Sequence, residues 1–109
     1  MLLLITQHAT KEQIHQASED LDGYVKFVID IEKKILTAGG MKHVEGEQLL
    51  LKEGSPQANL WGGGLDLETK EIDYDSMINI RPTVGNTSRQ VMDETIRKQM
   101  DEIVKKLLL

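Results

Sequence analysis

Two stretches of the chain repeat one pattern that is typical of a β-hairpin. VIDIEKKIL (residues 28–36) and GLDLETKEI (residues 64–72) both contain an apolar residue, Asp, an apolar residue, Glu, any residue and Lys. Each pattern predicts a strand, a turn rich in charged residues and a returning strand. The similarity has two possible origins, a true duplication or the convergence of two hairpin turns on the same residues. In both cases it predicts an antiparallel sheet.

The segments around the two hairpins complete an α+β pattern. An apolar run predicts an N-terminal strand, and Thr10, with Gln13 in capping-box spacing, predicts a helix that stops near residue 23. A helix over residues 31–38 is the alternative to the first returning strand. We expect strands over residues 2–5, 24–31, 35–38, 59–67 and 72–81, and later helices over residues 45–53 and from 93 onward. The order β-α-ββ-α-ββ-α predicts a single α+β domain over residues 1–109, with an antiparallel sheet and helices on one face.

Composition narrows the classes of function. The 109 residues are enough for one core, and the absence of cysteine excludes disulfides, thiolate nucleophiles and cysteine-ligated metals. The net charge of −5, with lysines alternating with acids, argues against nucleic acid and anionic membranes as partners. The N-terminal MLLLIT lacks the basic segment and the length of a signal peptide, and no window approaches the ~20 apolar residues of a membrane span. We therefore expect a cytoplasmic protein.

Hydrogen-bond donors gather in INIRPTVGNTSR, residues 78–89, where the second hairpin's last strand is expected to end. Period two places Asn79 and Arg81 side by side on one face of that strand. The loop after Pro82 adds Asn86, Ser88 and Arg89, and its Gly-Asn pair can turn the chain so that the two arginines approach each other. Arginine binds carboxylates and phosphates in a two-pronged geometry, so this segment predicts a pocket for a small anion.

A structural role for the same residues is the alternative. Arg81 would then pair with Asp75 or Asp73 across the sheet. Asn79 and Asn86 would satisfy backbone groups of the loop, and Ser88 would cap the next turn, because polar side chains near turns usually bond to their own chain.

LWGGGL, residues 60–65, places three glycines in a strand beside the only tryptophan, Trp61. Glycines weaken a strand and are typical of sites where another group approaches closely. If a four-residue turn sets the register, Trp61 lies opposite Ile78 and a flat groove runs beside the strand. Trp61 would line a ligand site there, or it would be a core residue for which the glycines make room. The segment lacks the residues of a phosphate-binding loop.

His43 is the histidine with the most suggestive surroundings. Glu45 and Glu47 follow it, and a histidine with a carboxylate can act as acid and base at neutral pH. A solvated loop histidine is the alternative. No histidine spacing predicts a metal site, no nucleophile elbow is present, and nothing in the sequence calls for a cofactor.

The chain ends in three leucines, Leu107 to Leu109, which cannot all face one core from a helix. One would be exposed or covered by a second copy, so we expect a homodimer.

Three hypotheses of function remain. The first is a ligand-binding or interaction module with the anion pocket described above. The second is a small-molecule hydrolase or proton-transfer enzyme that uses His43. The third is a protein-interaction subunit of a regulatory or toxin–antitoxin pair.

The segment DSMINIRPTVGNTSR resembles part of a small family of prokaryotic proteins of about this length that carry a domain of unknown function. VIDIEKKI, the step from Gly39 to His43, LLLKEGS and LWG extend the resemblance over most of the chain. The family pattern has Gly-Gly-Glu-Leu-His-Ala-Asp where this chain has GGMKHVE, so after the shared glycines only the histidine and an acid carry over. The family also has an asparagine shortly after Trp-Gly, where this chain has glycine. The resemblance implies a compact α+β cytoplasmic protein and no known activity.

Overall fold

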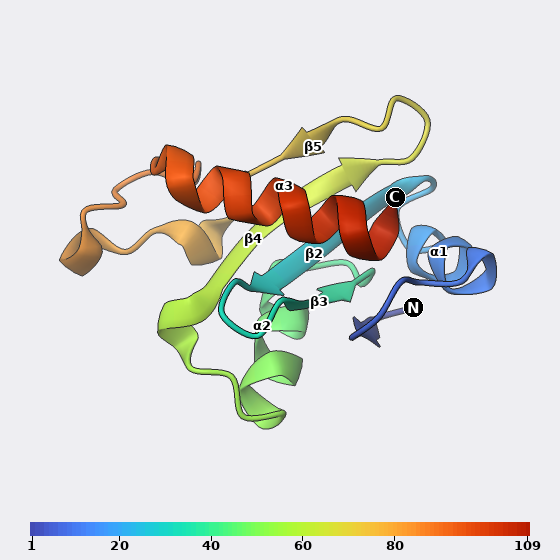
Figure 1. The fold of residues 1–109 in the computed structure, drawn as a ribbon, viewed down its shortest axis with the longest axis horizontal. Coiled ribbons are helices and arrows are strands. Elements are labelled where there is room, and N and C mark those ends of the chain that lie inside the picture. Colours follow the sequence, from blue (N-terminus) through green and yellow to red (C-terminus); the bar gives the residue numbers. More distant parts are fainter.

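The computed structural model describes residues 1–109 and contains one five-stranded antiparallel sheet with three α-helices (Figure 1). The strands follow the order β1-β3-β2-β4-β5 across the sheet. The α+β class, the two hairpins and the N-terminal strand expected from the sequence are confirmed. The strands are β1 (Leu3–Ile5), β2 (Tyr24–Asp30), β3 (Ile35–Ala38), β4 (Leu60–Asp66) and β5 (Ile72–Asp73), and the helices are α1 (Lys11–Ser18), α2 (His43–Lys52) and α3 (Glu94–Leu108).

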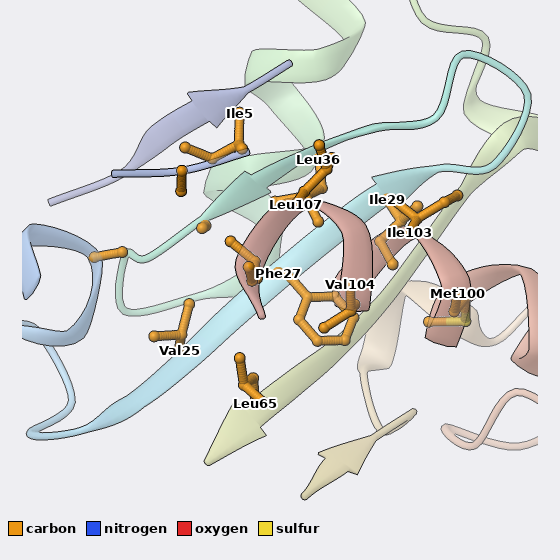
Figure 2. Close-up of a cluster of buried hydrophobic side chains, with 14 of the residues drawn as sticks. Ile5, Val25, Phe27, Ile29, Leu36, Leu65, Met100, Ile103, Val104 and Leu107 are labelled. Atoms are coloured by element: carbon orange, nitrogen blue, oxygen red, sulfur yellow. The ribbon is translucent and has the colours of Figure 1, made fainter. Parts of the chain in front are cut away.

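Helices cover both faces of the sheet, so the expectation that they share one face was wrong. The α3 helix and part of α1 pack on the face that carries Phe27 of β2, where they form the main core (Figure 2). The α2 helix lies on the opposite face, where Leu50 packs against Val28. Val28 stands among polar neighbours on the face expected to meet solvent, and its burial requires a cover. Gly46 lets α2 approach closely, because a side chain there would overlap Thr37 of β3.

The two hairpins share one turn structure, and the helix proposed as an alternative over residues 31–38 does not form. In each turn the carboxylate of the aspartate, Asp30 or Asp66, accepts hydrogen bonds from the backbone N–H groups two and three residues later. The lysine four residues after each aspartate has a left-handed backbone, with φ of 58° at Lys34 and 65° at Lys70. This common turn chemistry is sufficient to explain the repeated sequence pattern.

The prediction of a strand over residues 72–81 is wrong beyond Asp73. β5 pairs with β4 through Gly64 opposite Asp73, and the chain then leaves the sheet. Two short 3₁₀ turns, Met77–Asn79 and Pro82–Val84, follow in its place. The expected register, with Trp61 opposite Ile78, is therefore wrong as well. The physical reason lies in Asn79, whose side chain takes the position of the next strand residue, as described below.

The helix ends follow local sequence signals. Thr10 and Gln13 form the expected capping box at α1, and Asp93 accepts hydrogen bonds from the first turn of α3. None of the helices is both long and apolar enough to span a membrane. At the end of α3, Leu107 and Leu108 are buried in the chain's own core, and Leu109 is 42% exposed.

Candidate functional site

Asn79 fastens the loop after β5 to the edge of β4. The residue is completely buried, and its Oδ1 accepts a hydrogen bond of 2.8 Å from the N–H of Gly62. Its Nδ2 donates to the carbonyl of the same Gly62 at 2.9 Å, and to the carbonyls of Tyr74 and Arg89 at 3.0 Å each. The side-chain amide thus forms the pair of bonds that a neighbouring strand residue would form. Both amide hydrogens are directed at backbone oxygens.

Asn86 has the same role one turn later. Its Nδ2 donates to the carbonyls of Asn79, Ser88 and Gln90, at 2.8, 2.9 and 3.0 Å. Its Oδ1 accepts from the N–H of Met92 at 2.9 Å. The Ser88 hydroxyl accepts from the N–H of Gln90, as expected of a turn cap. These three polar residues of the predicted anion pocket therefore hold the loop in shape.

The two arginines do not meet. Arg89 is largely exposed, and its Nε donates to the carboxylate of Asp75 at 2.9 Å. Arg81 lies at the edge of β4 and lines a different cavity from Arg89. The single pocket expected to contain both arginines does not form, and the partner of Asp75 is Arg89 rather than Arg81. The loop, fastened by its asparagines, sends the two guanidinium groups to separate cavities.

Arg81 is a half-buried cation without a carboxylate partner. Its Nη2 donates to the carbonyl of Leu60, and its Nη1 is 3.5 Å from the carbonyl of Ala58. The guanidinium carbon lies 4.4 Å from the centroid of the Trp61 ring, in cation–π geometry. The Nε of Arg81 is buried and has no hydrogen-bond partner. Burial lowers the pKa of Arg81, and the negative charge of Glu47 opposes that shift.

A cavity of about 650 Å³, which we call the Arg81 cavity, opens beside this arginine. Half of its lining residues are apolar. Trp61, one of them, is 4% exposed and belongs to the main core, and its indole Nε1 is a second buried donor without a partner. Such orphan donors are rare in folded proteins. The lining includes Ile31, Trp61, Arg81, Val84, Met92 and Ile96.

A second cavity, of about 580 Å³, lies on the α2 face, and we call it the His43 cavity. His43 is the first residue of α2 and is half-buried, so it is not a loop histidine in water. Its Nε2 lies 2.7 Å from the carbonyl oxygen of Gly63. Burial lowers the pKa of His43, which keeps the imidazole neutral at neutral pH. The lining includes Tyr24, Lys26, Lys42, His43, Asp73 and Ser76.

Neither of the glutamates expected beside His43 lines that cavity. Glu45 turns back over the start of α2, where its carboxylate accepts from the N–H groups of Met41 and Lys42 at 3.0 Å each. Glu47 acts electrostatically on Arg81 instead. The predicted pairing of His43 with one of these carboxylates therefore does not form.

The glycine run of β4 makes room for side chains of the chain itself. A Cβ atom on Gly62 would lie 2.8 Å from the Cβ of Ser76 and 3.2 Å from the Cδ2 of His43. A Cβ atom on Gly64 would overlap the ring and hydroxyl of Tyr24. The glycines thus make room for Ser76, for Tyr24 and for His43 at the start of α2, rather than for Trp61, and these three neighbours line the His43 cavity.

The sequence as a whole matches a family of proteins of unknown function (DUF5674) over residues 3–107. The chain belongs to the DUF5674 family. The resemblance suggested by the INIRP segment is thereby confirmed. No curated protein and no solved structure matches the chain.

Sequence reasoning missed most of the His43 cavity in this DUF5674 chain. Tyr24, Lys26 and Asp73 line it, yet each was assigned to an ordinary strand. The available signal was the spacing of Gly62 and Gly64. Glycines two residues apart leave one face of a strand bare, so that face has to be filled by groups from elsewhere in the chain.

Proposed function

We propose that the protein binds a small organic anion in the Arg81 cavity. The observation that supports this proposal best is the state of Arg81, a half-buried guanidinium with no ion pair and an unpartnered Nε. Burying a charge is unfavourable unless it is paired, and structural arginines of this kind usually have a carboxylate partner. A bound carboxylate or phosphate would supply the missing counter-charge, although the Nε atom itself is enclosed by the chain.

The surroundings of Arg81 favour a carboxylate with an apolar body. Ile31, Val84 and Met92 offer apolar contacts in the cavity, and its volume suits a small molecule. Asp93 also lines the cavity, although its Oδ1 is occupied by the N–H groups of Thr95 and Ile96. The negative charge of Asp93 disfavours ligands with several charges, and a single carboxylate is therefore the better fit.

A thermal-shift screen of monocarboxylates, dicarboxylates and phosphate esters tests this function. A ligand at a hundred times its dissociation constant adds ~2.7 kcal/mol of stability. For a domain of this size, that raises the melting temperature by roughly 10 °C.

The matched variants are Arg81→Met and Arg89→Met, which remove the same charge from the two different cavities. We expect the stabilisation to disappear with Arg81→Met and to persist with Arg89→Met. If no compound stabilises the wild type, or if Arg81→Met responds equally, the Arg81 cavity is not an anion site.

Association with another protein is a second candidate, favoured by the loop between β5 and α3. That loop exposes the apolar side chains of Met77 (66%), Val84 (66%), Met92 (53%) and Ile80 (40%). Exposed apolar patches are typical of interaction sites.

The homodimer stays a prediction, as does the cytoplasmic location, which rests on the absence of cysteine. Light scattering on the protein as it elutes from a size-exclusion column tests the dimer. A monomer mass at high protein concentration would contradict the homodimer.

A further inference from the structure

We propose that the His43 cavity is a second ligand site, independent of the Arg81 cavity. In this site Nδ1 of His43 accepts a hydrogen bond from a hydroxyl of the ligand, and Lys26 and Lys42 hold its anionic group. The ligand class is therefore a small hydroxylated anion, such as a phosphate ester of a polyol.

The hydrogen bond to Gly63 sets the protonation of the His43 ring. A carbonyl oxygen only accepts, so Nε2, at 2.7 Å, carries the hydrogen and donates it. In the neutral ring, Nδ1 is then the unprotonated nitrogen with a free lone pair. Nδ1 makes no hydrogen bond within the chain and is not enclosed by it. The free acceptor of His43 is thus available to a ligand.

The position of the ring is fixed by its packing against β4. The ring belongs to the first residue of α2, and a Cβ atom on Gly62 would overlap Ser76 and crowd the His43 ring. Gly64 opens the same face to Tyr24. Glycine in a strand interior is destabilising relative to alanine. Two such positions on one face, both beside residues of the cavity, indicate a preorganised site.

The charges around the cavity leave two lysines free. Asp75 is paired with Arg89, and Asp73 accepts hydrogen bonds from the Tyr24 hydroxyl and from the N–H of Asp75, at 2.5 and 3.1 Å. Lys26 and Lys42 line the same cavity and make no ion pair with the chain.

In a chain with a net charge of −5, the lining of this cavity carries the cations Lys26, Lys42 and Arg89 against the carboxylates Asp73 and Asp75, a local excess of positive charge. The two lysines suit an anionic group. The neutral His43 beside them suits the uncharged, hydrogen-donating part of the same ligand.

The test follows the His43 ring nitrogens by NMR during a titration with glycerol phosphate, which carries a phosphate and hydroxyls. We expect a saturable change at His43 Nδ1 in the wild type and in Arg81→Met. In the Lys26→Met, Lys42→Met double variant we expect affinity to fall at least about tenfold, since a charge-assisted contact contributes that much. Both lysines are partly or fully solvent-accessible, and the backbone spectrum checks that the double variant stays folded.

Three results of the glycerol phosphate titration would each overturn the proposal, and a control with inorganic phosphate adds a fourth. The first is no change at His43 with glycerol phosphate up to about 50 mM, far above the dissociation constant of a millimolar binder. The second is an undiminished response in the double lysine variant. The third is loss of the response in Arg81→Met, which would assign it to the other cavity. Inorganic phosphate is the chemical control, and equal affinity for it would contradict the hydroxyl contact to His43.

Discussion

Replacing Asn79 by alanine should be the most destabilising single change in the loop between β5 and α3. The substitution removes the hydrogen bonds to both backbone groups of Gly62, which face away from β2 at the edge of β4. It also removes one bond to the carbonyl of Tyr74 and one to that of Arg89. These two carbonyls keep a second partner, because they accept from the N–H groups of Val91 and Ser76.

The expected cost follows from the two groups that lose their only partner. Leaving a buried donor or acceptor unsatisfied costs about 1–3 kcal/mol, so the N–H and the carbonyl of Gly62 together give about 4 kcal/mol. This is a large fraction of the ~5–15 kcal/mol that a domain typically has. The melting temperature should fall by on the order of 20 °C.

Chemical denaturation measures the loss, with Asn59→Ala as the matched control. The Asn59 side chain makes no hydrogen bond, so its removal should change stability by less than about 0.5 kcal/mol. Asn79→Asp tests, in addition, in which direction the stability changes with pH. Its new oxygen would face three carbonyl oxygens, which raises the folded pKa of that carboxyl above the unfolded value of about 3.9.

A raised pKa of an acid means that the folded state binds the proton more tightly. The stability of Asn79→Asp should therefore be greatest in acid and fall as the pH rises above about 4. A loss below about 1 kcal/mol in Asn79→Ala, or no fall with rising pH in Asn79→Asp, would refute the view that this amide replaces a strand residue.

Three further predictions concern the α2 face. Gly64→Ala should lower the free energy of unfolding by about 1–3 kcal/mol, because the new methyl group overlaps Tyr24. In a Tyr24→Ala background this loss should vanish. Equal losses in both backgrounds, measured by denaturation, would contradict the packing. Glu45→Ala should lower stability by about 1 kcal/mol, because two N–H groups at the start of α2 lose their acceptor; an unchanged denaturation midpoint would show that water replaces the cap. The lowered pKa of His43 means that the unfolded chain binds the proton more tightly, so stability should fall as the pH drops below about 6.5. His43→Gln should reduce that slope, and an unchanged slope in this variant would contradict the burial of the ring.

The sequence predicted those parts of the fold that depend on neighbouring residues. The hairpin turns follow from an aspartate that bonds to N–H groups two and three residues later, and the cap of α1 follows from Thr10 and Gln13. These signals are local, so pattern reasoning finds them. The helix expected from residue 93 onward is α3, and its aspartate cap is again a local signal.

The misplaced features depend on contacts between distant residues. The pattern of residues 72–81 suited a strand, but the amide of Asn79 took over the pairing with Gly62. The position of α2 depended on one apolar residue, Val28, on a face that otherwise appears polar. The separation of Arg81 from Arg89 followed from the folded loop. Composition alone does not determine such geometry, and the contact of Arg81 with Trp61 arises in a register other than the one expected.

The most direct test of anion binding at Arg81 uses the only tryptophan as its reporter. Trp61 gives a single indole N–H signal, and that buried N–H has no partner in the cavity that Arg81 shares. We would titrate phenylacetate, a carboxylate with an apolar body, and follow this signal in a proton–nitrogen correlation spectrum. We expect a saturable shift in the wild type and in Arg89→Met, and none in Arg81→Met. An unchanged indole signal in the wild type, or the same shift after Arg81→Met, would contradict the proposed site.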